Sequence, residues 1–311
     1  MDTTTRHLLG YARSQNSTGL IVRQHGLPLV EESWAATASS GFAPFVHGET
    51  IEGQILEDVA SLQKSVVAVL IAIAVDKTLL DVASPVNDYL GSGWSRASPA
   101  QEMKVRIVDL LTMTSGLNET FGYEAPPGSC FFYNTPVYAI IGTILFAAAG
   151  MRLDRITHEW LTEPLGLKNT SWRKRPPALA DVGNASGLVT TARDLATFGE
   201  MILAGGIGRN GDRIISSSSL RALFERSPRN PAYGWLWWLN GGDYVIDVHA
   251  RRTPGPLIPA APCDLVAAFG YLDRRVYLVP SLELVVVRTG AAVADEDFDQ
   301  QIWQRVNEMV G

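Results

Sequence analysis

The sequence predicts an α/β (α+β) fold, in which strands from the two ends of the chain form an antiparallel sheet and helices lie between them. Two short strands are expected within residues 19–32, around a turn at His25 and Gly26. Strand-like composition returns near the C-terminus, in the segments 265–269, 275–279 and 284–288. Helical patterns fill the chain between these strands. The sheet is therefore expected to be closed by the two termini, flanked by helices and joined to a mainly helical second domain.

The length of 311 residues is enough to bury a large core, in one domain or in two closely joined ones. We find no internal repeat and no low-complexity linker, so one domain over residues 1–311 is expected. Within it, a sheet subdomain is predicted at about 1–60 and 230–311, and a helical subdomain at about 61–229.

The composition argues against several function classes. The net charge is -6 and no long basic run occurs, which makes nucleic acid an unexpected partner. Two cysteines, Cys130 and Cys263, are too few for a disulfide framework. No Cys/His cluster has metal-ligand spacing, so neither a metal nor another cofactor is expected. The first residues lack the apolar segment of a secretory signal, which predicts a cytoplasmic protein without membrane contact. The oligomeric state stays open.

The segment around which the chain is organised is Ser61-Leu62-Gln63-Lys64, followed by an apolar run over residues 66–75. The run is too short to cross a bilayer and predicts a buried helix that ends near Asp76. Positions i and i+3 share one helix face, so the Ser61 hydroxyl and the Lys64 amine can meet. Burial lowers the pKa of a lysine, which would let Lys64 take the serine proton. The alternative is a serine helix cap with a first-turn lysine, which is the commoner meaning of an isolated S-x-x-K.

A second candidate is Tyr133, in a loop over residues 127–136 that precedes an apolar helix at 137–149. Pro136 is suited to the first turn of that helix, and a tyrosine at such a junction can direct its hydroxyl into a cleft. Considered alone, a tyrosine in this position is more often an ordinary residue at the edge of the core, with its hydroxyl in water.

The remaining segments frame these candidates. Residues 233–239 have strand-like composition, and their three tryptophans suit either core packing or a pocket wall. The Pro-rich segment 249–263 is predicted to be a lid or a binding loop. Residues 35–53 show no clear period. Helices are expected at 79–90 after a turn, at 105–113, before 167, from about 191 and at 296–309.

With these segments in order, the chain resembles the serine β-lactamase-like superfamily, and most closely its class C branch with the lactamase-like esterases and 6-aminohexanoate-oligomer hydrolases. The S-x-x-K signature belongs to the penicillin-recognising enzymes. Any one match is weak, but the ordered set covers nearly the whole chain. The matching segments are Ala60–Ser65, Leu110–Leu117, Pro127-Gly128, Tyr133-Asn134-Thr135 with Tyr138, Pro164–Leu167, Ala192–Leu195 and the strands around Pro280.

The resemblance implies a β-lactamase/transpeptidase-like fold and a covalent mechanism. Ser61 would attack a carbonyl group to form an acyl-enzyme, and Lys64 and Tyr133 would share the roles of general base and proton donor. An ammonium group near Tyr133 would have to hold its hydroxyl toward the phenolate. The oxyanion hole would combine the Ser61 N–H with one near residues 268–271. The implied substrate-binding residues are Thr135, Tyr138, Ala268, Phe269, Gly270, Tyr271 and Arg274.

Two departures from the superfamily pattern bear on the substrate. Thr135 stands where the Tyr-x-Asn motif has asparagine, and Ala268 stands where Lys-Thr-Gly has its lysine. A β-lactam carboxylate would lose its main anchor, which predicts weak or no β-lactamase activity. Asp273 and Arg274 replace the Gly-Gln of the oligomer hydrolases and could contact a substrate, each other or water. Arginines that could replace the strand cation are Arg251, Arg252 and Arg274.

The sequence therefore predicts a serine hydrolase that cleaves a small ester or amide through an acyl-enzyme. One alternative on the same scaffold is an acyl or aminoacyl transferase, in which an amine replaces water in deacylation. The other is a non-catalytic binding protein that kept the cleft, because a fold does not by itself fix a function.

Overall fold

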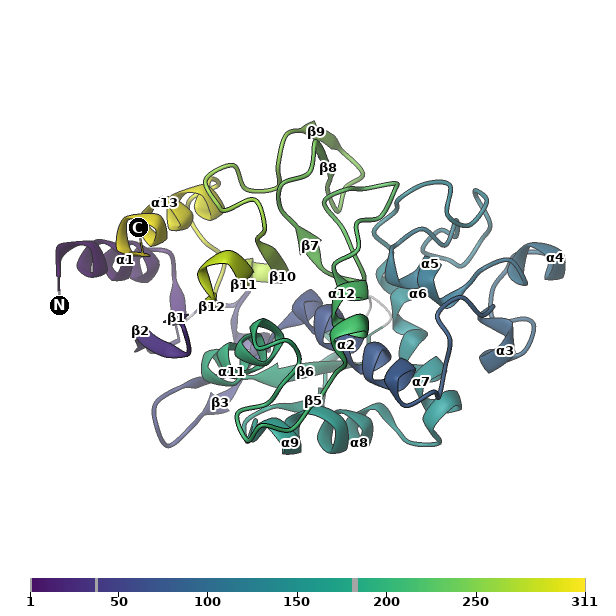
Figure 1. The fold of residues 1–311 in the computed structure, drawn as a ribbon, viewed down its shortest axis with the longest axis horizontal. Helices are drawn as coiled ribbons and strands as arrows, with labels where there is room; N and C mark the ends of the chain where they lie inside the picture. The colour runs from purple at the N-terminus through teal and green to yellow at the C-terminus, as the bar shows by residue number, and fades with distance from the viewer. Residues whose placement is uncertain (1, 37–38, 181–183, 311) are drawn as a thin grey trace.

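A central antiparallel sheet of six strands organises the computed structural model, which describes residues 2–36, 39–180 and 184–310 (Figure 1). The two N-terminal strands lie together at one edge of it and join the C-terminal strands, because β1 pairs with both β2 and β12. This arrangement confirms the predicted closure of the sheet by the two ends of the chain. In spatial order the strands are β2 (Leu27–Ser33), β1 (Ser17–Gln24), β12 (Leu284–Gly290), β11 (Arg274–Val279), β10 (Val266–Gly270) and β7 (Trp238–Leu239).

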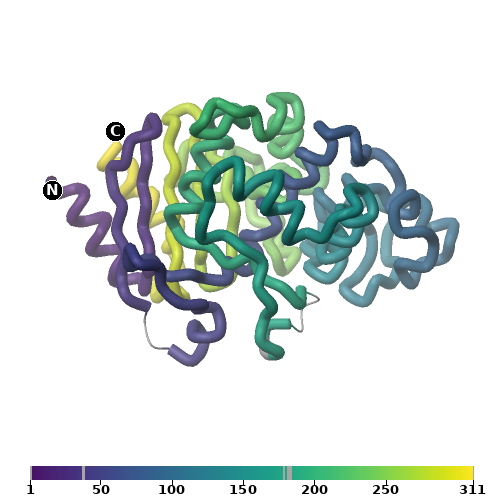
Figure 2. The backbone as a smooth tube through the Cα atoms, turned by 90° about the horizontal axis from the view of Figure 1, so that it is seen from below, coloured from purple at the N-terminus to yellow at the C-terminus, as the bar shows by residue number. Residues whose placement is uncertain are grey.

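Helices cover both faces of this sheet, so its inner strands are buried on both sides. Every residue of β11 and β12 is buried, which explains their nearly continuous apolar sequences. Gly199 of α11 packs against Leu278 and Val285 on one face, and Trp303 of α13 packs against Tyr277 on the other. The two terminal helices lie side by side, and the chain ends are neighbours (Figure 2). The terminal helices are α1 (Thr3–Ser14) and α13 (Phe298–Val310), and helix α11 comprises Ala192–Leu203.

The buried helix α2 (Gln63–Asp76) runs through the middle of the molecule (Figure 1). Twelve of its residues are buried, as its apolar sequence predicted. The short helix η2 (Ala60–Leu62) precedes it and connects it to a second, four-stranded sheet, which was not predicted from the sequence. That sheet has the order β3 (Val46–Glu49), β4 (Ile55–Asp58), β6 (Ser186–Thr190) and β5 (Ser171–Lys174). Residues 61–229 are thus not helical throughout.

The remaining elements are short, and several differ from expectation. The helix expected at 137–149 is two helices, and the strand expected at 233–239 is reduced to β7. Within the segment 249–263, strand β9 (Arg252–Pro254) pairs with the preceding strand β8 (Tyr244–Ile246) in a two-stranded ribbon. The helices are α3 (Asn87–Leu90), α4 (Pro99–Glu102), α5 (Ile107–Leu111), α6 (Thr135–Ala139), α7 (Ile141–Ala149), α8 (Leu153–Thr157), η3 (His158–Thr162), α9 (Glu163–Leu165), α10 (Pro177–Ala180) and α12 (Ser217–Leu223), with short turns η1 (Ala43–Phe45), η4 (Tyr271–Asp273) and η5 (Pro280–Leu282).

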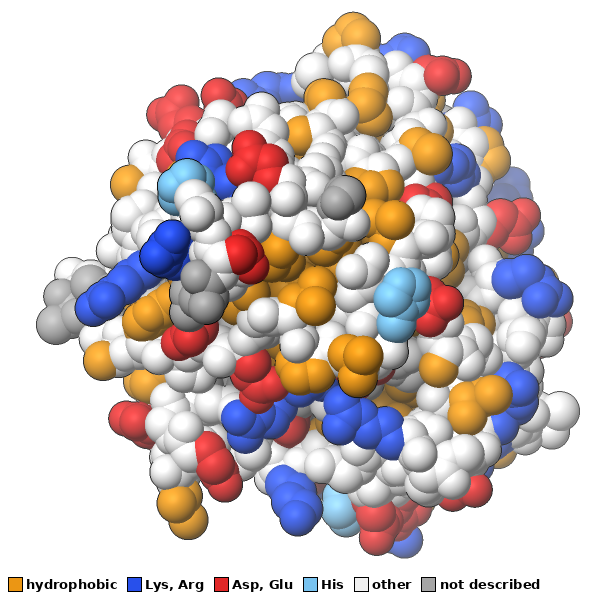
Figure 3. Space-filling view, turned by 60° about the vertical axis from the view of Figure 1, so that its left-hand side comes forward, with side chains coloured by type: hydrophobic (Ala, Val, Ile, Leu, Met, Phe, Trp, Pro, Cys, Tyr) orange, Lys and Arg blue, Asp and Glu red, His pale blue; other side chains and the backbone are white. Residues whose placement is uncertain are grey.

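The surface carries charges of both signs. The face near the chain ends shows acidic and basic side chains interspersed around a hollow with hydrophobic side chains (Figure 3). Within the described ranges, no single helix has the length and apolar composition to cross a bilayer; the segments Thr135–Ala149 and Leu153–Leu165 meet both criteria only when taken together, and they are bent by 79°. Cys130 and Cys263 are free and exposed, in accord with the expected lack of a disulfide.

Candidate active site

The Ser61 hydroxyl and the Lys64 amine meet at the junction of η2 and α2. The Lys64 Nζ donates a hydrogen bond to Ser61 Oγ over 2.9 Å, as the i, i+3 spacing predicted. Ala60, directly before the serine, has a φ of +50°, a left-handed conformation that costs energy for a residue with a Cβ. Such strain is often found where a side chain must be aimed at a substrate.

The Lys64 side chain is enclosed by aromatic rings. Only 2% of the residue is exposed, and its Nζ lies 4.9 Å from the ring centroids of both Tyr133 and Tyr138. Burial, and secondarily the positive charge of Arg175, lowers the pKa of Lys64 to about 7. At neutral pH a large share of this lysine is therefore the free amine, which can accept a proton.

Tyr133, in the segment that leads into α6, is the third residue beside Ser61 and Lys64. Burial raises the pKa of its hydroxyl to about 12, while the hydroxyl of Ser61 acts in the opposite direction. At neutral pH the group is therefore a protonated phenol. The expectation that an ammonium group holds Tyr133 toward the phenolate does not fit this environment, since the Lys64 amine lies over the ring face.

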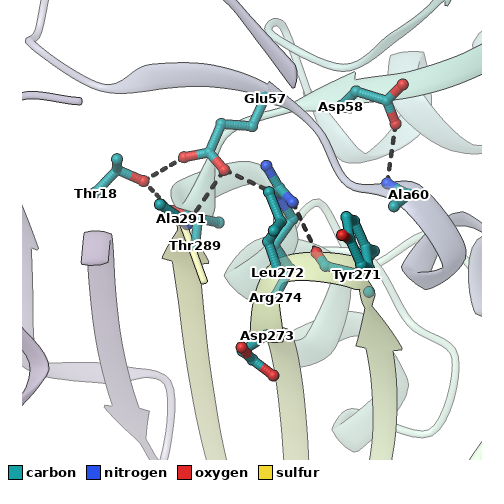
Figure 4. A network of polar contacts seen from close by, with 12 residues as sticks. Thr18, Glu57, Asp58, Ala60, Tyr271, Leu272, Asp273, Arg274, Thr289 and Ala291 are labelled. Atoms are coloured by element: carbon teal, nitrogen blue, oxygen red, sulfur yellow. Dashed lines mark hydrogen bonds and ion pairs between the residues drawn. The ribbon is translucent and has the colours of Figure 1, made fainter. Parts of the chain in front are cut away.

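A buried ion pair supports the turn that carries Ser61. Asp58 accepts hydrogen bonds from Arg175 Nε at 2.7 Å and Nη2 at 2.8 Å, and from the N–H of Ala60 at 2.9 Å (Figure 4 shows the last contact). Arg175 also donates to the Gln63 side-chain oxygen over 3.1 Å. The Asp58 carboxylate thus fixes Ala60, the strained residue before Ser61, and neutralises the Arg175 cation that acts on Lys64.

A pocket of about 450 Å³ opens at Ser61 and Tyr133. One wall is a row of three stacked rings, with Trp238 between Tyr133 at 6.1 Å and Phe269 at 5.9 Å. The end of β10 closely approaches the segment that carries Ser61, because a Cβ on Gly270 would lie 2.3 Å from the Val59 carbonyl oxygen. The other lining residues are Val248, Tyr271, Leu272, Asp273, Arg275 and Ala292.

Of the seven predicted substrate-binding residues, Phe269, Gly270 and Tyr271 line this pocket, and the other four are not among its described lining residues. Tyr138 packs on Lys64 but lines a separate cavity of about 420 Å³. Thr135 begins α6 outside the pocket lining, and Ala268 is completely buried in the core. The asparagine beside Thr135 has a structural role, since Asn134 caps α6 and donates to the Leu117 carbonyl oxygen.

The three arginines proposed as a replacement cation lie elsewhere. Arg274 is fully buried and pairs with Glu57 at 3.0 Å, so it is not in position to contact a substrate (Figure 4). Arg251 pairs with Asp247 at the surface, and Arg252 lies over the Tyr244 ring. None of the three is among the pocket-lining residues that the structure describes.

Sequence reasoning missed Arg275 and left the role of Asp273 open. These two residues form an ion pair of 3.0 Å at the pocket, rather than the Asp273–Arg274 contact considered from the sequence. Neighbouring residues on a strand face opposite sides, so Arg274 and Arg275 of β11 take different environments. The alternation of side chains along a strand predicts that Arg274 and Arg275 point to opposite faces of the sheet, but it does not predict which of them faces the pocket. Trp238 was one of three tryptophans considered for a pocket wall; Trp237 beside it is completely buried.

Comparison with known proteins agrees with the fold. A beta-lactamase family model matches residues 6–255. An uncharacterized protein of Alkalihalophilus pseudofirmus is 25% identical over 84% of this chain and 79% of its own length. Among solved structures, a putative beta-lactamase from Bacteroides dorei has a TM-score of 0.75 at 17% identity, covering 99% of this chain and 98% of that one. A putative 6-aminohexanoate-dimer hydrolase from Bacillus anthracis has a TM-score of 0.72 at 16% identity, covering 97% and 81%.

The family match spans most of the chain, and the structural similarity extends over nearly all of it. The chain therefore belongs to the beta-lactamase family and has the fold of the serine β-lactamase-like hydrolases.

Proposed function

We propose that this protein is a serine hydrolase that cleaves a small ester or amide through an acyl-enzyme on Ser61. The observation that carries the proposal is the 2.9 Å contact between Ser61 Oγ and a buried lysine whose pKa is lowered to about 7. A cap with a first-turn lysine would leave the amine in water, whereas this one is enclosed by two tyrosine rings.

The two neighbours of Ser61 suit different halves of the reaction. The free amine of Lys64 takes the proton from Ser61 Oγ as the oxygen attacks the carbonyl carbon. Tyr133, protonated at neutral pH, gives its proton to the leaving oxygen or nitrogen as the tetrahedral intermediate collapses. The proton held by Lys64 then restores Tyr133, and the free amine activates the water that hydrolyses the acyl-enzyme.

The close approach of Gly270 to η2 supports an oxyanion hole between these elements. The N–H of Ser61 and a backbone N–H near Gly270 or Tyr271 would bind the developing negative charge. Removal of a single donor from such a site typically costs about 10²- to 10³-fold in turnover.

A fluorophosphonate probe and p-nitrophenyl butyrate test the proposal. Wild type should be labelled and should hydrolyse the ester, and Ser61→Ala should do neither while keeping its thermal unfolding transition. Ser217→Ala, at the exposed start of α12, is the matched control and should behave as wild type. Wild-type rates in Ser61→Ala would refute the assignment, and an unlabelled, inactive wild type would favour the non-catalytic alternative.

A further inference from the structure

We infer that the pocket beside Ser61 selects substrates with a positively charged group, which is recognised by the Asp273 carboxylate and the exposed ring of Tyr271. This inference rests on the proposed hydrolase function and adds the substrate class. The charged residues among the described pocket lining are Asp273 and Arg275, so their contacts decide which charge a substrate meets.

Arg275 has no N–H left for a substrate. Its Nε donates to Asp299 at 2.9 Å, and its Nη2 donates to Asp273 at 3.0 Å and to Asp299 at 3.3 Å. Its Nη1 donates to the carbonyl oxygens of Gly270 and Arg274, both at 3.3 Å. A guanidinium has five N–H donors, and all five have protein acceptors here. Arg275 therefore holds the pocket wall and does not serve as an anchor for an anion.

Asp273, in contrast, keeps acceptor capacity toward the pocket. Its side chain is 30% exposed, and it accepts hydrogen bonds from Arg275 and from the Val293 N–H at 3.2 Å. A carboxylate offers about four acceptor positions, so about two remain beyond these contacts with the described residues. In Figure 4 the carboxylate points away from the buried Glu57–Arg274 pair.

The backbone fixes the position of this carboxylate. Leu272 and Asp273 have φ values of +62° and +60°, an unusual pair of left-handed residues without glycine. The buried Arg288 holds them there, with hydrogen bonds to the carbonyl oxygens of Leu272 at 2.8 Å and Asp273 at 3.2 Å. Strain that the surroundings maintain is typical of binding sites, where it orients a group before the ligand arrives.

The walls of the pocket suit the same ligand charge. Tyr271, which is 66% exposed, lines the pocket, and aromatic faces attract cations, quaternary ammonium groups above all. In the row of three stacked rings, Trp238 lies between the other two, whose faces already carry Lys64 and Arg275. A carboxylate group on the substrate would instead meet Asp273.

Three p-nitrophenyl esters of similar acyl length test the inference. They are the 4-(trimethylammonio)butanoate, its neutral isostere 5,5-dimethylhexanoate, and the anionic hemiglutarate. Each kcat/KM is divided by the second-order rate constant for hydrolysis of the same ester by hydroxide, which removes differences in intrinsic reactivity and leaves out the intramolecular attack of the hemiglutarate carboxylate. Wild type should prefer the cation over the isostere by about ten- to a hundredfold, and should disfavour the anion.

Asp273→Asn should lower the cation-to-isostere ratio by about tenfold, and Asp273→Glu should retain a preference for the cation. Asparagine tolerates the left-handed backbone, which favours a folded variant. Asp88→Asn, at an exposed site in α3, is the control and should keep the wild-type ratio. A wild-type ratio near one, or an unchanged ratio in Asp273→Asn, would overturn the inference while the hydrolase stands. Failure of wild type on all three esters would refute the proposed function instead.

Discussion

Asp58 and Arg175 form a two-point ion pair under the turn that carries Ser61, with N···O distances of 2.7 and 2.8 Å. Both side chains are nearly completely buried, at 1% and 5% exposure. Residues 117 positions apart in the sequence are therefore joined directly beneath Ser61 and hold its turn in place.

Asp58→Asn should lower both stability and activity. Removal of one member of a buried ion pair leaves a buried charge without compensation, and typically costs about 3–5 kcal/mol. The free energy of unfolding, measured by urea titration, should fall by an amount in this range. Asp154→Asn is the matched control, because it breaks the exposed Arg152–Asp154 pair and should cost under about 1 kcal/mol. Equal losses in the two variants would contradict the structural role of Asp58.

Lys64 should impose a pH dependence on the reaction. Because its pKa is lowered to about 7, kcat/KM for a neutral ester should rise with pH through this value as the free amine forms. Lys64→Met should lose about 10²- to 10⁴-fold in turnover and should lose this rise. A wild-type profile that stays flat between pH 6 and 8, or a similar profile in Lys64→Met, would contradict the role of general base.

The same group should link stability to pH. Its pKa is lowered from the ordinary 10.5 of the unfolded chain, so between about pH 7 and 10.5 the unfolded state binds the extra proton. The stability of wild type relative to Lys64→Met should therefore increase with pH across this window. Urea titrations of both proteins at several pH values check the sign, and a decreasing difference would contradict it.

Tyr133→Phe should separate the roles of acid and base. If the protonated hydroxyl donates to the leaving group, amide hydrolysis should fall by about 10²- to 10⁴-fold. Hydrolysis of p-nitrophenyl esters should fall much less, because p-nitrophenolate departs without a proton. Parallel assays on an ester and an anilide with the same acyl group measure the two effects. Equal losses would identify Tyr133 as the base that activates Ser61.

The local parts of the site could be predicted from the sequence, and the long-range parts could not. Residues i and i+3 share one face of a helix, so the contact between Ser61 and Lys64 could be predicted from their spacing and from the apolar run that follows them. The fold followed from strand patterns at both ends. The packing of Tyr138 on Lys64 depends on tertiary structure, and no local pattern specifies it.

The charges of the pocket show the same limit. The sequence raised Asp273 and Arg274 as a possible contact, but the strand register sends Arg274 to Glu57 and brings Arg275 beside Asp273 and Asp299. Alternation along a strand predicts that adjacent arginines diverge. Which of them meets the pocket depends on residues more than 200 positions away, as the Glu57–Arg274 bond illustrates with its separation of 217.

The pocket also predicts weak activity on β-lactams. Ala268 stands in the position of the strand lysine, and none of the arginines 251, 252 and 274 lies in the described pocket lining. A charge-assisted hydrogen bond to a carboxylate contributes about 1.5–3 kcal/mol, so its loss should weaken recognition by about one to two orders of magnitude. Repulsion by Asp273 would add to this loss. Wild type should therefore hydrolyse short-chain p-nitrophenyl esters and turn over nitrocefin slowly or not at all. Nitrocefin turnover comparable to that of the esters would contradict this argument, and its loss in Arg251→Ala or Arg252→Ala would identify a cation that moves into the pocket with the β8–β9 ribbon.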